Sequence, residues 1–219
     1  MDIPIPRLPQ PLTTVENFAA YARPLIADDE TVSGIKIRKE QYRRADFFKM
    51  DMRKCALEAC GFHQCCFEKA SFIDVRFHNC NFSNCSFPGA YFERCQFTAC
   101  KGIGMDLAGA AIKHTSFADC NLQYANFNTA KLAGVRFGRV DFTDASMAEA
   151  KLRQFVAGKS KFIRNDFRKT MLAGIDFTGS ILSGPIVSSP PDELRGMVVD
   201  VFQAAALAGL LGIKIKQPE

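Results

Sequence analysis

Apolar residues recur at every fifth position over most of the chain. Stepping by five from Phe47 to Leu182 meets 28 residues, of which 16 are Phe, 7 are Leu, 2 are Met and 1 is Ile. Only Gly102 and Ala157 depart from this rule. A period of five fits neither an α-helix nor a simple β-strand. The chain is therefore predicted to turn once per repeat, with no inserted loop over this span.

A second column, of small residues, lies two positions before each centre. It holds mostly Ala, Cys and Val, and the other three positions of each repeat are mostly polar. Two residues in five are thus expected to point inward. Ile37 and Tyr42 keep the same phase, which predicts an imperfect coil ahead of Phe47.

The two exceptions are expected to distort the coil slightly. At Ala157 the large and small columns have exchanged, because Phe155 stands where a small residue belongs. Beside Gly102, the flexible side chain of Met105 is expected to fill the gap.

This repeat resembles that of the pentapeptide-repeat family, whose motif is a small residue, Asn or Asp, Leu or Phe, and two polar residues. The motif is matched by ADF at 45–47, CNF at 80–82, CNL at 120–122, ANF at 125–127 and VDF at 140–142. The resemblance covers about residues 43–184. It implies an all-β fold, a right-handed quadrilateral parallel β-helix with four repeats per coil. Seven such coils at strand spacing would form a rod roughly 34 Å long.

The flanking segments do not repeat and are expected to form short helical caps at both ends. We divide the chain into an N-terminal cap (1–30), a solenoid (31–184) and a C-terminal element (185–219). Thr13 and Glu16 have capping-box spacing, which predicts a helix that ends before Pro24. Ser189 and Asp192 predict a second helix, followed by a short strand at 213–215.

The C-terminal element carries more apolar surface than the end of a rod can cover. We therefore expect a homodimer through this tail rather than a simple monomeric cap. The expected contact residues are Met197, Val201, Phe202, Leu207, Leu210, Leu211, Ile213 and Ile215.

The segment LAGLLGIKI at 207–215 resembles the ending of the Qnr quinolone-resistance proteins. This resemblance implies an end-to-end dimer that mimics duplex DNA. It also implies binding to bacterial DNA gyrase or topoisomerase IV, and protection of the enzyme from quinolones or similar gate poisons.

The charge of the chain does not favour DNA mimicry equally on all walls. The whole chain has a net charge of +5, and residues 43–184 hold 20 Lys and Arg against 13 Asp and Glu. The wall centred on Phe47 to Phe167 in steps of 20, here called the acidic wall, has a net charge of −1. The wall centred on Met52 to Leu172, the basic wall, has a net charge of +4. The candidate partner-binding residues are the acids of the first wall, unless they only solvate the rod: Asp46, Glu68, Asp106, Glu149 and Asp166.

Eight of the nine cysteines fall in the small column, and four of them are spaced by 20 residues: Cys60, Cys80, Cys100 and Cys120. A metal or redox ladder is the functional alternative. Parallel side chains do not converge as a tetrahedral metal site requires. We therefore interpret the cysteines as small buried hydrophobes, unpaired and free of metal.

Three functions stay open: a topoisomerase protector, a generic protein-interaction scaffold, and a nucleic-acid binder that uses the basic wall. Outward aromatic residues are few, so no direct nucleic-acid binding is expected. An enzyme is not expected, because His63, His78 and His114 fall on separate walls without a nucleophile motif or a phosphate-binding Gly loop. We expect no cofactor. No long apolar run or secretory signal is found, which predicts a cytoplasmic protein without membrane contact.

Overall fold

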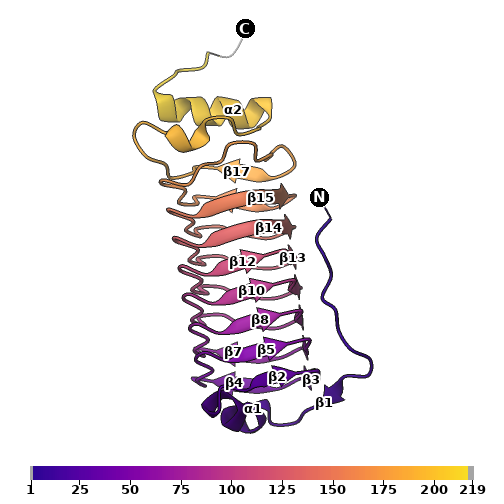
Figure 1. The fold of residues 1–219 in the computed structure, drawn as a ribbon. Coiled ribbons are helices and arrows are strands. Elements are labelled where there is room, and N and C mark those ends of the chain that lie inside the picture. Colours follow the sequence, from indigo (N-terminus) through magenta and orange to yellow (C-terminus); the bar gives the residue numbers. More distant parts are fainter. Residues whose placement is uncertain (1, 217–219) are drawn as a thin grey trace.

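Parallel strands stacked into a rod make up most of the molecule (Figure 1). The computed structural model describes residues 2–216. Within the rod, neighbouring strands pair in register at an offset of 20 residues, so that Phe72 pairs with Phe92 and Phe92 with Ile112. The strands around Ile37 and Tyr42 form the coil that was expected ahead of Phe47. The parallel β-solenoid predicted from the repeat is confirmed.

The four walls differ in how continuous their strands are. The basic wall holds β2 (Thr31–Ser33), β5 (Asp51–Arg53), β8 (Ser71–Ile73), β10 (Tyr91–Glu93) and β12 (Ala111–Lys113). The third wall, reached next along the chain, holds β3 (Ile35–Arg38), β6 (Ala56–Glu58), β9 (Arg76–His78), β11 (Gln96–Thr98) and β13 (Ser116–Ala118). Two longer strands cross both of these walls: β14 (Lys131–Gly138) and β15 (Lys151–Gly158).

The other two walls are paired more sparsely. The fourth wall combines single bridges with β4 (Gln41–Arg43), β7 (Gly61–His63), β16 (Lys161–Ile163) and β17 (Ile181–Ser183). The acidic wall is joined by single bridges that run from Asp46↔Cys66 to Asp166↔Ile186.

Phenylalanine rings fill the interior in columns. Rings one coil apart lie nearly parallel, with centroids 4.6 Å apart for Phe67 and Phe87 and 4.4 Å apart for Phe77 and Phe97. Rings on neighbouring walls meet edge to face, as Phe77 and Phe82 do. Both arrangements are favoured for aromatic pairs. The interior is therefore a packed core.

Most repeats turn through one residue in the left-handed region of backbone conformation, two positions after the centre. Lys49 has a φ of 56° and Lys54 a φ of 53°. Such a conformation costs a non-glycine residue about 1–2 kcal/mol. Hydrogen bonds to the next coil offset this cost, because Lys49 N donates to Glu68 O and Lys54 N to Ile73 O, both at 2.9 Å.

Gly102 lacks the large side chain of its column, and Met105 supplies one. A Cβ atom at Gly102 would lie 3.0 Å from Met105 Sδ and 2.8 Å from Leu122 Cδ2. The thioether of Met105 is buried there, as the sequence predicted.

The exchange of large and small residues at Phe155 and Ala157 also changes the surface of the rod. Phe155 is buried in the small column, and its ring centroid lies 5.2 Å from that of Phe137. On the same coil Leu152 is only half-buried, whereas Leu132, one coil earlier, is buried. The basic wall is therefore less closely packed at the coil that contains Leu152.

At the N-terminal end, α1 (Phe18–Ala27) closes the first coil, and the Phe18 ring stacks on that of Phe47 at 5.4 Å. Asn17 caps this helix by accepting a hydrogen bond from Ala20 N. The predicted capping box is wrong, because Thr13 and its neighbour form β1 (Thr13–Thr14), which pairs with β3. The predicted end before Pro24 is also wrong. The buried apolar face of α1 outweighs the one hydrogen bond that Pro24 cannot donate.

Residues 2–12 run as an extended arm alongside the rod rather than across its end (Figure 1). Pro6 is buried, and Arg7 N donates a hydrogen bond of 3.1 Å to Asp74 Oδ1. Asp74 is 4% exposed and also accepts two hydrogen bonds of 2.9 Å from the Arg94 guanidinium. The Asp74 carboxylate therefore joins the N-terminal arm to the basic wall, and this set of hydrogen bonds is here called the latch.

We expect Asp74→Asn to lower the free energy of unfolding by about 1–3 kcal/mol at neutral pH. Burial raises the pKa of Asp74, but hydrogen bonds from Arg94 and the Arg7 amide outweigh burial and lower it. The latch therefore stabilises the fold above the pKa of an unfolded Asp, and this contribution is lost as the pH falls through the folded-state pKa. Urea unfolding at pH 7 and pH 3 measures the difference, which should shrink at pH 3. The exposed pair of Asp119 with Arg139 supplies the control Asp119→Asn, expected to change the free energy of unfolding less than Asp74→Asn does, because solvent screens exposed ion pairs. Equal effects of the two variants would contradict the latch.

The C-terminal cap consists of the 3₁₀ turn η1 (Asp192–Leu194), the helix α2 (Val201–Ala208) and the 3₁₀ turn η2 (Gly209–Leu211). The predicted helix start at Ser189 is wrong, because the chain continues the solenoid ladder until Val198 pairs with Asp176. The capping box lies instead at Asp200 and Gln203. Residues 213–216 form neither helix nor strand, so the short strand expected at 213–215 is not found there.

Buried polar side chains join this cap to the last coil. Glu193, 2% exposed, accepts a hydrogen bond of 2.6 Å from Lys169 N. Gln203 Nε2 donates to Phe177 O at 3.0 Å and to Ser180 O at 2.8 Å. The cap therefore satisfies backbone N–H and C=O groups that the end of the solenoid would otherwise leave unpaired.

Candidate functional surfaces

The structure places the five candidate acids on one wall. Asp46, Asp106 and Asp166 occupy the same position three coils apart, in the column of bridged residues. Each accepts a hydrogen bond from the backbone N–H two residues later, at 2.9 to 3.0 Å. Glu68 and Glu149 lie at the edge of the wall nearer the basic wall. These carboxylates form a sparse line along the rod.

Three of the five acids are paired with cations. Asp166 lies 2.6 Å from Arg168, and hydrogen bonding to Arg168 holds the pKa of this carboxyl below its ordinary value. The other two pairs are Glu149 with Lys169 at 2.9 Å and Glu68 with Lys69 at 3.4 Å. Among the described residues, Asp46 and Asp106 make no ion pair. Stepping through the sequence by 20 would have found the pair of Glu149 and Lys169.

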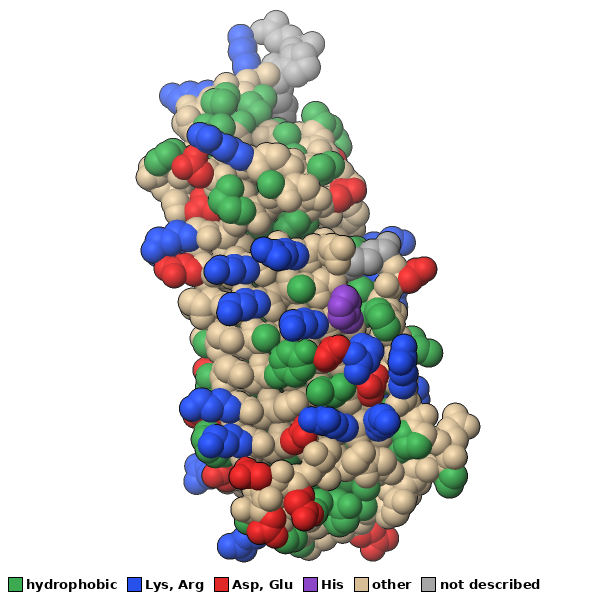
Figure 2. All heavy atoms as spheres, in the orientation of Figure 1, with side chains coloured by type: hydrophobic (Ala, Val, Ile, Leu, Met, Phe, Trp, Pro, Cys, Tyr) green, Lys and Arg blue, Asp and Glu red, His purple; other side chains and the backbone are tan. Residues whose placement is uncertain are grey.

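The tail residues fall into two groups. Met197 and Leu207 are half-buried against the core of the rod. Six others are exposed, led by Phe202 at 83%, and Figure 2 shows hydrophobic side chains gathered over this end of the molecule. The exposed group consists of Val201, Phe202, Leu210, Leu211, Ile213 and Ile215.

The nine cysteines are unpaired in the structure, and eight of them are buried. Their thiols donate to backbone carbonyls, as Cys80 does to Leu57 O at 3.5 Å. Thr170 and Ser180, in the same column, make equivalent hydrogen bonds. Burial raises the pKa of Cys55 to about 11, so this thiol stays protonated at neutral pH. Because Ser and Thr occupy the same column and make the same kind of hydrogen bond, the cysteines of this column have a structural role.

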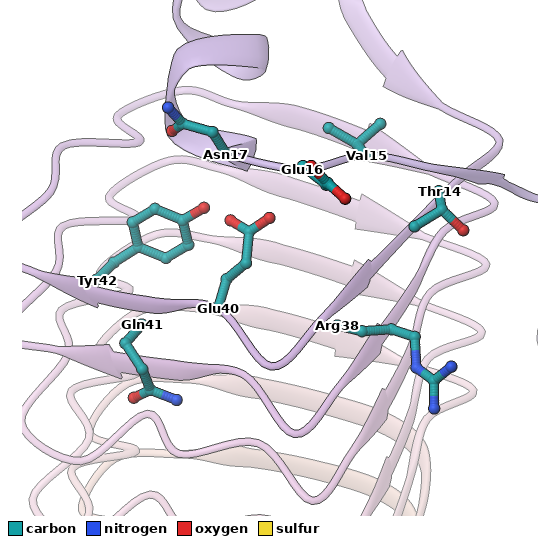
Figure 3. A pocket seen from close by; sticks show the side chains of 8 residues that line it. All are labelled: Thr14, Val15, Glu16, Asn17, Arg38, Glu40, Gln41 and Tyr42. Carbon is teal, nitrogen blue, oxygen red and sulfur yellow. The ribbon is translucent and has the colours of Figure 1, made fainter.

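A hollow of about 510 Å³ lies between residues 14–17, which lead into α1, and the first coil (Figure 3). Its two most enclosed polar groups already bind the start of the helix, because Glu40 Oε2 accepts from Phe18 N at 2.9 Å and Tyr42 Oη from Ala19 N at 3.3 Å. These side chains act as a second helix cap. The hollow therefore belongs to the closure of the rod.

Within residues 2–216, no three His, Cys, Asp or Glu side chains lie close enough together to hold a metal ion. Over the same residues, none of the helices has the length and apolar character needed to cross a bilayer.

The fold defines the class of this protein as a β-solenoid, a rod of coils stacked in register at a spacing of 20 residues around a packed core. The chain matches the family model of the pentapeptide repeat region over residues 50–127 and 70–147, and that of pentapeptide repeats over residues 145–184. Together these matches cover more than half of the chain, which therefore belongs to the pentapeptide-repeat proteins. Such proteins generally act as structural or interaction proteins.

Solved structures with a similar fold include QnrB1, a plasmid-mediated fluoroquinolone resistance protein, at 17% identity and a TM-score of 0.44, covering 84% of this chain and 99% of QnrB1. A pentapeptide-repeat protein of the Arabidopsis thaliana thylakoid lumen has 25% identity and a TM-score of 0.35, covering 46% of this chain and 66% of that one. HetL of Nostoc has 13% identity and a TM-score of 0.29, covering 78% and 86%. No curated protein matches the sequence significantly. The family assignment rests on the repeat itself.

Proposed function

We propose that the protein is a non-catalytic homodimer that binds a bacterial type II topoisomerase and protects it from quinolones or similar gate poisons. The observation that carries the proposal is the exposed apolar tail. Its sequence, LAGLLGIKI at 207–215, resembles the ending of the quinolone-resistance proteins. In a dimer this surface would be buried and two rods would lie end to end.

The dimensions of the rod agree with a DNA-like shape. The coils from Val32 to Val187 number eight, so at about 4.8 Å per coil one rod is roughly 38 Å long. One turn of B-DNA is roughly 34–36 Å. Asp46 and Asp106 are the carboxylates on the acidic wall best able to stand in for phosphates, because no cation of the described residues pairs with them.

A generic interaction scaffold is the second candidate. The observation that favours it is the pairing of Glu68, Glu149 and Asp166 with cations of the same wall. A wall neutralised in this way attracts a basic DNA-binding surface less strongly than phosphates do. Topoisomerase binding is therefore expected to be weak and to decrease with salt.

The test is a DNA-cleavage assay with purified gyrase and ciprofloxacin. The wild-type protein should raise the drug concentration needed to trap cleaved DNA. Asp46→Asn with Asp106→Asn should reduce this protection about tenfold, because two interfacial charges are lost. The Asn side chains keep the acceptor for the Phe48 and Ala108 amides, so the wall stays folded.

The matched control is Asp141→Asn with Asp176→Asn, which makes the same change on the fourth and third walls. It should protect as well as wild type. Equal loss in both variants would reject the acidic wall as the contact. A wild-type protein that neither binds gyrase nor alters its drug sensitivity would leave the scaffold as the function.

A further inference from the structure

Charges on the basic wall are segregated along the rod. Its first three coils mix both signs, with Asp74 bound to Arg94 and Asp51 to Arg53. From residue 111 to residue 174 the outward positions of this wall include cations but no acid. Figure 2 shows the resulting group of Lys and Arg side chains over the upper half of the face that it presents. The group consists of Lys113, Lys131, Lys151 and Arg153.

These cations lack carboxylate partners within the described part of the chain. Lys131, Lys151 and Arg153 are exposed and make no ion pair there. Lys113 Nζ lies over the Tyr91 ring, 5.2 Å from its centroid. The charge of this patch is therefore available to a partner.

A hollow with an apolar floor lies between the cations. Two adjoining cavities, of about 490 and 250 Å³, share Lys151 and Arg153 as lining residues. Half-buried Leu152 and Met171, which is 53% exposed, contribute apolar surface to the larger cavity. The hollow lies on the coil where Phe155 and Ala157 have exchanged places. Glu149 and Lys169, which pair with each other at 2.9 Å, also line the larger cavity, so its charged side chains are three cations and one acid. The hollow therefore joins an apolar floor to a rim of net positive charge.

The positive charges of this patch also repel one another, which destabilises the fold. Lys131 and Lys151 are direct partners in the register of β14 and β15. Like charges placed opposite each other on neighbouring strands are destabilising. A bound anion would relieve this repulsion.

We propose that this hollow docks an acidic peptide segment of a partner protein, with carboxylates on Lys131, Lys151 and Arg153 and an apolar side chain against Leu152 and Met171. Charge complementarity selects the acids, and the apolar floor distinguishes such a segment from a purely charged ligand. The cations of this surface lie on the basic wall, and the hollow borders the acidic wall at Glu149.

The experiment uses fluorescence anisotropy of a short labelled peptide with a central Leu flanked on each side by Asp and Glu. The triple variant K131Q/K151Q/R153Q should bind this probe about tenfold more weakly than wild type. The control K39Q/R76Q/K101Q removes the same charge from other walls and should bind as wild type does. Equal weakening in both variants, or no binding to wild type, would overturn the proposal.

A second probe with Ser in place of the central Leu tests the apolar floor. It should bind wild type about threefold more weakly, since one apolar side chain no longer reaches Leu152. Equal binding of the two peptides would overturn the role of the hollow. A labelled DNA duplex that binds more tightly than the peptide, and is lost in the same triple variant, would show that the patch is a nucleic-acid site instead.

Lys151→Glu separates a binding defect from unfolding. It places an acid opposite Lys131 and should raise Tm by about 1–3 °C while abolishing peptide binding. A stabilised variant that has lost binding supports the patch as a functional surface. A lowered Tm, or retained binding, would contradict it.

Discussion

Phe82→Ala is expected to lower the free energy of unfolding by about 3–5 kcal/mol. The Phe82 ring is 3% exposed and stacks on that of Phe62, with centroids 5.2 Å apart. It also meets the rings of Phe77 and Phe87 edge to face. The next residue of its own column is Gly102, where the Met105 side chain is already needed to fill the gap. The cavity left by the ring therefore stays open, and denaturant unfolding followed by circular dichroism should show the loss.

The control for this variant is Arg76→Ala. Arg76 is an exposed residue of β9, and surface substitutions of this kind usually change stability by less than about 0.5 kcal/mol. Asn84, which is nearer to Phe82, is less suitable because its φ of 58° favours Asn over Ala. If Phe82→Ala and Arg76→Ala were equally mild, Phe82 would not lie in the core that the fivefold register defines.

The solenoid could be predicted from the sequence because its period is unbroken. Once Phe47 is placed inside, a step of five fixes the position of every later centre, and a step of 20 fixes its neighbour in the next coil. Even the exceptions followed from their surroundings, since Met105 is the flexible residue closest to the gap at Gly102. The periodic burial of large apolar residues thus determines the fold from residue 31 onward.

The caps were predicted less well, because they follow local rules that tertiary contacts override. Thr13 has the spacing of a helix cap, yet its backbone pairs with the strand of the first coil. At the other end, Asp200 and Gln203 have the same spacing and do form the capping box. The sequence alone did not distinguish the two cases, because the difference lies in which segment still pairs with the ladder.

The electrostatic character of the walls could also be predicted only in part from the sequence. A count of charges gave each wall its net charge, but not the partners of individual residues. Asp119 with Arg139 and Asp144 with Arg164 pair across one coil. Such pairs come from the same 20-residue step that sets the core. Among the described residues, ion pairing leaves Asp46 and Asp106 unpaired on the acidic wall and Lys131, Lys151 and Arg153 unpaired on the basic wall.

Phe202→Asp together with Leu211→Asp is expected to convert the proposed dimer into a monomer. Phe202 is 83% and Leu211 60% exposed, so neither contributes much to the fold of a single chain. In a dimer each would be buried twice by symmetry, and central aromatic residues of an interface commonly contribute about 2 kcal/mol or more. The dissociation constant should rise at least about a hundredfold. Light scattering coupled to size-exclusion chromatography measures the change.

The substitutions are a sharper test than removal of the tail. A truncation before Asp192 would also remove Glu193 and Gln203, which bind the last coil, and would expose the open end of the rod. The matched control is Phe48→Asp with Ile181→Asp, which places the same charges at exposed apolar positions outside the tail. It should remain dimeric, and both variants should keep the circular dichroism spectrum of the wild type. A wild-type protein that is monomeric at high micromolar concentration would show that α2 and the residues after it only cap the solenoid. Dissociation of both variants would show that added charge, rather than the tail contact, separates the protomers.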